Sequence, residues 1–181
     1  MKPLPEILQS ISRYAEAYAE IQVIQEESKI IPEGDQKTGC FGELYGYLYL
    51  AHTNPEAELA YGSHSEKGWD IECRTKTRSK RIQIKTVSAY SKTRSISPIH
   101  NGWDELFIVY LDKKFTPTGF WIITDKAILA EGEVLKGCKC RNPEKTKTGS
   151  TILPFGDNKI AELNAAIASK KTQKPNEQRT T

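Results

Sequence analysis

Two apolar runs constrain the fold more than any other feature of this sequence. The segments ELFIVYL (105–111) and GFWIIT (119–124) are apolar at both odd and even positions. Because successive side chains of a β-strand point to opposite faces, such a run predicts a strand that is covered on both sides. Both runs are far too short to cross a bilayer. We therefore expect them to form the centre of a sheet that has a layer of chain on each face.

Two segments upstream of these runs alternate between apolar and polar residues. In WDIECR (69–74) and RIQIKT (81–86), every second residue is apolar, the pattern of a half-buried strand. The linker TKTRSK between them is short enough for a hairpin, so we expect the two strands to pair antiparallel.

Helical periodicity appears at both ends of the chain. Apolar residues recur every three or four positions from residue 4 to about 31, and again in CFGELYGYLYLAHT (40–53). A last helix is expected over 158–169, with Asp157 or Asn158 as its N-cap. The pattern predicts one α/β domain over 1–170, with a mixed sheet of four to five strands flanked by helices. The polar segment 171–181 is expected to be a disordered tail.

Composition bounds the class of protein. At 181 residues, with 38% hydrophobic residues and a net charge of only +3, the chain is an ordinary globular domain whose total charge does not select a partner. The first residues lack the apolar segment of a secretion signal, and the four cysteines follow no disulfide framework. We therefore expect a cytoplasmic protein that does not bind membranes. The pair Cys138 and Cys140 suggests incidental thiols in a polar loop rather than a zinc site, which needs four ligands.

Polar side chains of the two alternating strands are expected to meet. Asp70 projects from the polar face of the first strand, and Gln83 and Lys85 project from the polar face of the second. Carboxylate and amide oxygens are ligands for Mg²⁺, and a lysine beside such an ion can orient or deprotonate a water molecule. This combination indicates hydrolysis of phosphodiester bonds.

These residues resemble the PD-(D/E)xK nuclease superfamily, which includes many restriction endonucleases. The resemblance rests on GWD (68–70) at the start of one strand and QIK (83–85) in the next, and FGELYG places Glu43 on the helix where family members often carry a glutamate. It implies a restriction-endonuclease-like core in which Asp70, Gln83 and Glu43 bind Mg²⁺, for which Mn²⁺ can substitute. It also implies that Lys85 assists the attacking water.

The sequence departs from the commonest family pattern at two points. Gln83 stands where an acidic residue is more usual, and the proline that often precedes the aspartate is missing. The amide removes one negative charge, which leaves the number of metal ions open. Either Glu43 or Glu72 can supply the missing charge, and we rank Glu43 first.

A basic segment surrounds the candidate site. Between Arg74 and Trp103 the chain has no acidic residue. This pattern suits contact with DNA phosphates, whereas the alternative is a basic face exposed to solvent. The polar loop within 86–103 could read base edges or be a mobile surface loop, and 136–149 could extend the contact. The residues expected to bind DNA, besides Lys85, are Arg74, Lys76, Arg78, Lys80, Arg81, Lys92 and Arg94.

The resemblance suggests a magnesium-dependent endodeoxyribonuclease, either a type II restriction enzyme or the cleavage subunit of a two-chain one. Two alternatives remain, a structure-specific nuclease of the junction resolvase kind and a DNA-binding module that keeps the fold without cleavage. Because one site cuts one strand, double-stranded DNA as the substrate implies a homodimer or a second catalytic or recognition subunit.

Overall fold

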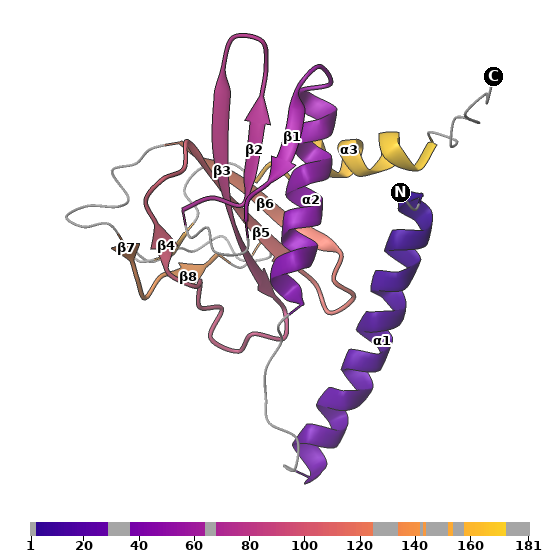
Figure 1. Cartoon of the computed structure of the whole chain (residues 1–181). Coiled ribbons are helices and arrows are strands. Elements are labelled where there is room, and N and C mark those ends of the chain that lie inside the picture. Colours follow the sequence, from indigo (N-terminus) through magenta and orange to yellow (C-terminus); the bar gives the residue numbers. More distant parts are fainter. Residues whose placement is uncertain are drawn as a thin grey trace.

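The structure, a computed structural model, describes residues 3–28, 37–63, 68–124, 134–141, 143, 152–153 and 158–172. Its centre is a five-stranded mixed sheet with the order β1-β2-β3-β5-β6 (Figure 1). The strands of this sheet are β1 (Glu58–Tyr61), β2 (Ile71–Arg74), β3 (Ser79–Ser88), β5 (Glu105–Leu111) and β6 (Pro117–Ile123). The helices are α1 (Leu4–Ser28), α2 (Thr38–Thr53) and α3 (Ile160–Thr172). Four two-residue strands are β4 (Ile99–His100), β7 (Val134–Leu135), β8 (Lys139–Cys140) and β9 (Ile152–Leu153).

The predicted mixed α/β architecture is confirmed. The expected hairpin is present, because β2 pairs antiparallel with β3 and Ile71 lies opposite Ile82. Strand β3 then runs parallel to β5, with Gln83 opposite Leu106 and Lys85 opposite Ile108. The last helix begins at Ile160, two residues later than expected, and Oδ1 of the preceding Asn158 accepts hydrogen bonds from the amides of Ile160 and Phe120.

Several boundaries differ from the sequence prediction. Strand β2 begins at Ile71 rather than at residue 69, and β3 extends from 79 to 88 rather than from 81 to 86. The pattern missed β1 entirely. Residues 119–123 of the run 119–124 belong to β6, which lies at the edge of the sheet rather than at its centre. The end of the first expected helix, 29–31, and most of the expected tail, 173–181, lie outside the described residues, as does Asp157.

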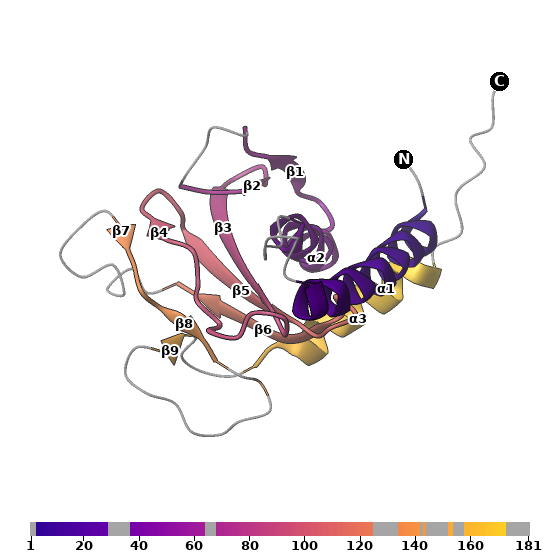
Figure 2. The same cartoon turned by 90° about the horizontal axis from the view of Figure 1, so that it is seen from below.

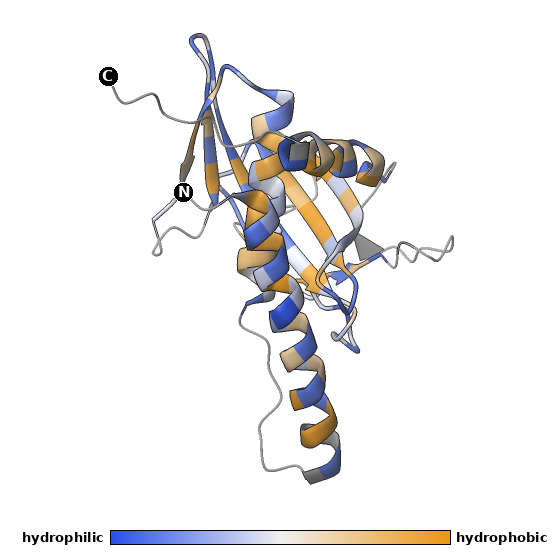
Figure 3. Ribbon diagram, turned by 90° about the vertical axis from the view of Figure 1, so that its right-hand side faces the viewer, coloured by the Kyte–Doolittle hydropathy of each residue, from blue (hydrophilic) through white to orange (hydrophobic). Residues whose placement is uncertain are grey.

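The three helices lie together on one face of the sheet (Figure 2). Ile82 and Ile84 of β3 point to this face and join a core that includes Tyr45 and Leu48 of α2 and Leu163 of α3. Figure 3 shows the apolar strands behind these helices. Among the helices of the described ranges, none is both long and apolar enough to cross a membrane.

The opposite face of the sheet is covered by the segment between β3 and β5 together with β7 and β8 (Figure 2). Ile96, Ile99 and Trp103 of this segment are buried against Leu106 and Ile108 of β5. Residues 86–88 complete β3, and the rest of the segment 86–103 forms part of a packed second layer, which explains its length better than a free surface loop does.

Helix α2 approaches β3 closely at Gly42. A Cβ atom at this position would lie less than 3.0 Å from all three side-chain atoms beyond the Cα of Thr86. Thr86 is β-branched, so no rotation of its side chain clears all of these contacts. The absence of a side chain at Gly42 therefore allows the start of α2 to lie against β3.

We expect Gly42→Ala to lower the free energy of unfolding by about 1–3 kcal/mol, because overpacking outweighs the better helix propensity of alanine. Thermal or denaturant unfolding measures this loss. Gly39→Ala is the matched control in the same helix, where a Cβ meets nothing within 4 Å. It should leave stability equal or slightly higher. Equal stabilities of the two variants would contradict close packing at Gly42.

Candidate active site

Asp70 directly precedes β2 and lies beside β3. Its backbone amide donates a hydrogen bond to the carbonyl of Ile82 at 2.8 Å, and its Oδ2 accepts one from the amide of Ile84 at 2.5 Å. The antiparallel register of β2 and β3, continued by one residue, places Asp70 opposite Gln83. The carboxylate is thus held at a fixed position against β3 by the backbone of the sheet.

Gln83 and Lys85 project from the face of β3 opposite to Ile82 and Ile84. The Gln83 side chain is buried, with a relative exposure of 1%, and Lys85 is half-buried. Burial lowers the pKa of Lys85, while the negative charges of Asp70 and then Glu43 raise it. Both carboxylates are therefore close enough to act on the same ammonium group.

Glu43 reaches this region from α2. It follows Gly42, whose contact with Thr86 brings the helix next to β3. Glu43 also acts on Tyr61 at the end of β1: burial is the main cause that raises the pKa of Tyr61 to about 12, and the charge of Glu43 is the next. Glu43 is thus placed within electrostatic reach of both β1 and Lys85.

Glu72, the other acid considered for the site, is engaged elsewhere. One oxygen of its carboxylate accepts a hydrogen bond from Arg74 at 2.6 Å and the other accepts one from Ser79 at 2.7 Å. These two hydrogen bonds hold the pKa of Glu72 below its usual value. The carboxylates that act on the pKa of Lys85 are those of Asp70 and Glu43. Glu43 is therefore the better candidate for the additional metal ligand.

The donor set Asp70, Gln83 and Glu43 fits a hard divalent cation. Mg²⁺ is commonly held in proteins by one or two carboxylates, with further oxygens from amides, substrate and water. No group of three histidine, cysteine, aspartate or glutamate side chains suited to a metal occurs within the described ranges. A site made of these residues therefore depends on the amide of Gln83 and on oxygens from outside the protein.

The basic residues expected to bind DNA do not share one surface. Arg81 is exposed on the face of β3 that carries Gln83, and its guanidinium carbon lies 5.6 Å from the centre of the Trp69 ring. Arg74 is ion-paired with Glu72. Lys80 points to the α2 face and is ion-paired with Glu105. Lys76 and Arg78 are exposed in the β2–β3 turn, Lys92 is exposed in the second layer, and Arg94 is half-buried there with a φ of 54°.

The sequence interpretation missed a second Gly-Trp-Asp, at 102–104, that matches the first at 68–70. Asp104, directly before β5, forms two hydrogen bonds with the backbone of β3. Its amide donates to the carbonyl of Arg81 at 2.7 Å, and its Oδ2 accepts from the amide of Arg81 at 2.8 Å. Gly102, with a φ of 118°, lies against Gly68. The repeated tripeptide was the sequence signal for this arrangement. Asp70 of the first copy binds the backbone of β3 from the β2 side, and Asp104 of the second copy binds it from the β5 side.

Cys138 and Cys140 both pack in the apolar core of the second layer. Cys140 is fully buried in the second layer, which raises the pKa of its thiol to about 12, and Cys138 is partly buried beside it. All four cysteines are free. Cys140 is therefore a core thiol rather than a residue of a polar loop. Most of the basic stretch 136–149 beyond residue 141 lies outside the described residues.

No family model and no curated protein matches this sequence. Among solved structures, the chain is similar to the bacterial homing endonuclease I-Ssp6803I, with a TM-score of 0.42 and 13% sequence identity. The match covers 78% of this chain and 100% of the other. A likeness of this extent identifies no activity, so the chemistry has to follow from the side chains of this chain.

Proposed function

We propose that this protein is a metal-dependent nuclease that hydrolyses phosphodiester bonds of DNA. One observation carries the proposal: a half-buried lysine, Lys85, follows the buried Gln83 by two residues on one strand face and lies within electrostatic reach of Asp70 and Glu43. Carboxylates, an amide and a lysine are groups that can bind a divalent ion and assist hydrolysis of a phosphodiester bond. The resemblance to the PD-(D/E)xK pattern supports the same assignment.

Each residue has a distinct role in this proposal. Asp70, Gln83 and Glu43 would hold Mg²⁺, with Mn²⁺ as a substitute, and the ion supplies positive charge next to the scissile phosphate. Lys85 orients the attacking water and accepts its proton, for which the lowered pKa of its ammonium group is favourable. The negative charges of Asp70 and Glu43 act on Lys85, and Asp70 itself accepts a hydrogen bond from the amide of Ile84.

The biological setting that we favour is a cytoplasmic restriction enzyme of type II, or the cleavage subunit of a two-chain one. A single chain offers one such site, so cutting both strands of a duplex requires a second copy or a second subunit. The exposed Lys76 and Arg78 of the turn between β2 and β3 supply positive charge for the phosphates.

The proposal is tested by incubating the full-length chain with supercoiled plasmid in the presence of Mg²⁺, in the presence of Mn²⁺, and with EDTA. We expect nicked or linear products only with a divalent ion, and sequencing of the ends locates the cut. A four-way junction and its matched linear duplex, run in parallel, distinguish a resolvase from a restriction-type enzyme. Absence of cleavage on every substrate, also after a candidate partner subunit is added, would contradict the nuclease proposal.

A second candidate function is a DNA-binding module with an idle site, and the amide of Gln83 favours it because an amide contributes no charge to a metal. Gln83→Glu separates the two. If the site is active, the variant should bind Mn²⁺ at least about tenfold more tightly, measured by calorimetry, and should still cut plasmid. A parent that is inert beside a Gln83→Glu variant that cuts would identify a degenerate site.

A further inference from the structure

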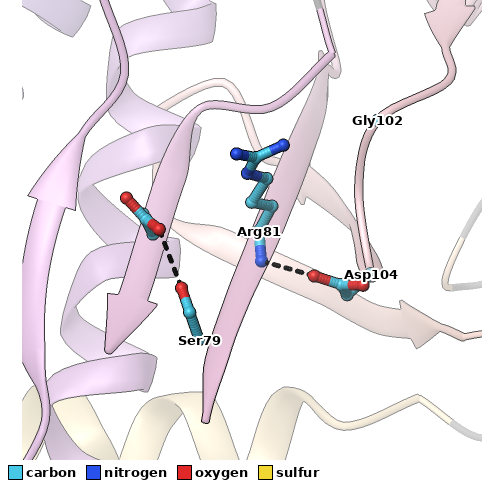
Figure 4. A pocket seen from close by; sticks show the side chains of 5 residues that line it. Ser79, Arg81, Gly102 and Asp104 are labelled. Atoms are coloured by element: carbon cyan, nitrogen blue, oxygen red, sulfur yellow. Dashed lines mark hydrogen bonds between the residues drawn. The ribbon is translucent and has the colours of Figure 1, made fainter. Parts of the chain in front are cut away.

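An open pocket of about 420 Å³ lies beside the candidate active site and is not used by the proposed chemistry. Its lining residues come from β2, from β3 and from the segment that leads into β5 (Figure 4). Arg81 and Gln83 are two residues apart on the same face of β3, a separation of about 7 Å along a strand. A molecule in the pocket would therefore adjoin the site of cleavage. The lining residues are Glu72, Ser79, Arg81, Gly102 and Asp104.

Arg81 is the cation of this pocket and its backbone is rigidly held. Asp104 binds both the amide and the carbonyl of Arg81, so the second Gly-Trp-Asp fixes the point from which the side chain starts. The guanidinium lies over the ring of Trp69. Within the parts of the chain that the structure describes, Arg81 forms no ion pair. Its planar set of donors is thus oriented without being neutralised by a direct partner.

Acidic groups beside Arg81 determine what it can bind. The carboxylates of Glu72 and Asp104 both line the pocket. Glu72 is engaged by Arg74 and Ser79, whereas Asp104 uses Oδ2 for the amide of Arg81. Two carboxylates oppose the entry of a phosphate, which is itself an anion. A neutral ligand that offers acceptors to the guanidinium and a donor to Asp104 suits the pocket better.

A guanine–cytosine base pair has this pattern on its major-groove edge. Guanine presents the acceptors N7 and O6, which an arginine binds with two hydrogen bonds, and cytosine presents the N4 amino donor, which an acidic residue accepts. We infer that this pocket reads one guanine–cytosine pair close to the cleaved bond, with Arg81 on guanine and Asp104 on cytosine. The inference rests on the proposed function, because it requires that duplex DNA lies on this face.

The inference is tested by selection from a pool of DNA duplexes with a randomised central stretch. The full-length chain carrying Lys85→Ala is used, so that bound DNA is not cut. We expect the selected duplexes to share a guanine–cytosine pair at one position. Replacing this pair with adenine–thymine should weaken binding by about 10- to 100-fold, the range of one bidentate base contact.

Two variants in the same background identify the residues. Arg81→Lys keeps the charge but loses the two-pronged donor, so it should abolish most of the preference and change affinity for the adenine–thymine duplex less than about threefold. Asp104→Asn keeps one oxygen for the amide of Arg81 but turns an NH₂ group toward the cytosine amino group, and it should also reduce the preference. Arg13→Lys, at an exposed position of α1 away from the pocket, is the matched control and should retain the full preference.

Each other outcome overturns the inference in a distinguishable way. An equal loss of affinity for all duplexes in Arg81→Lys makes Arg81 a phosphate contact. Selected duplexes without a common guanine–cytosine pair, or a preference that Arg81→Lys retains, exclude base reading by this pocket and leave the nuclease proposal intact. A chain that binds no duplex at any salt concentration refutes both the inference and the proposed function.

Discussion

Replacing Lys85 with alanine should reduce cleavage of plasmid DNA by about 10²- to 10⁴-fold, the usual contribution of a positioned acid or base. Lys85 lies within electrostatic reach of both Asp70 and Glu43. Lys85 is half-buried, so its removal also relieves a desolvation cost and should not unfold the protein. Single-turnover cleavage at saturating enzyme measures the chemical step.

The controls separate catalysis from binding and folding. Lys76→Ala removes an equal charge from the exposed β2–β3 turn and should retain cleavage, with at most a small loss of affinity for DNA. Lys85→Met keeps the length and apolar stem of the side chain, so it should be as inactive as Lys85→Ala and melt at a temperature close to that of the parent. Parent-like single-turnover rates in a folded Lys85→Ala protein would exclude Lys85 from the reaction.

The sequence predicted the parts of the fold that depend on local pattern. The run at 105–111 is β5, residue for residue, because strands covered on both faces leave an uninterrupted apolar signal. The β2–β3 hairpin followed from alternation and a short linker. These features depend on neighbours in sequence, and local side chains are sufficient to specify them.

Other parts depend on contacts between distant segments. The run at 119–124 suggested a central strand, yet β6 lies at the edge, because coverage of both faces does not determine where a strand lies within a sheet. Strand β1 has four residues with no buried face, which leaves no clear periodic signal. In the second layer, Ile96, Ile99 and Trp103 are buried at the i, i+3, i+7 spacing of a helix, yet the segment that carries them is not helical, so their burial depends on contacts with distant β5.

The candidate site shows the same division. Asp70, Gln83 and Lys85 follow from strand alternation, and the register of β2 and β3 places the first two opposite each other. The choice between Glu43 and Glu72 needed the structure, because it depends on how α2 packs against β3 at Gly42 and on the hydrogen bonds that engage Glu72. Alternation alone places Glu72 on the same strand face as Asp70 and cannot show that its oxygens are occupied.

Asp70→Asn should nearly abolish metal-dependent cleavage while it leaves the fold intact. The asparagine retains a side-chain oxygen that can accept the hydrogen bond from the amide of Ile84, so the junction of β2 and β3 is preserved. What the variant loses is the negative charge that a hard cation requires. We expect affinity for Mn²⁺ to fall at least about tenfold, which is about 1.4 kcal/mol, in calorimetric titration with a non-cleavable duplex present.

A second aspartate of the chain provides the matched control for this result. Asp112 also accepts hydrogen bonds from backbone amides, those of Lys114 and Thr116, but it lies in the turn between β5 and β6. Asp112→Asn should therefore leave metal affinity and cleavage unchanged, although it makes the same chemical change at the same kind of hydrogen-bonded carboxylate. If Asp70→Asn and Asp112→Asn bind Mn²⁺ equally well, Asp70 serves only to join β2 to β3 and the metal ligand lies elsewhere. A selective loss in Asp70→Asn assigns the carboxylate to the metal, because both carboxylates accept hydrogen bonds from backbone amides.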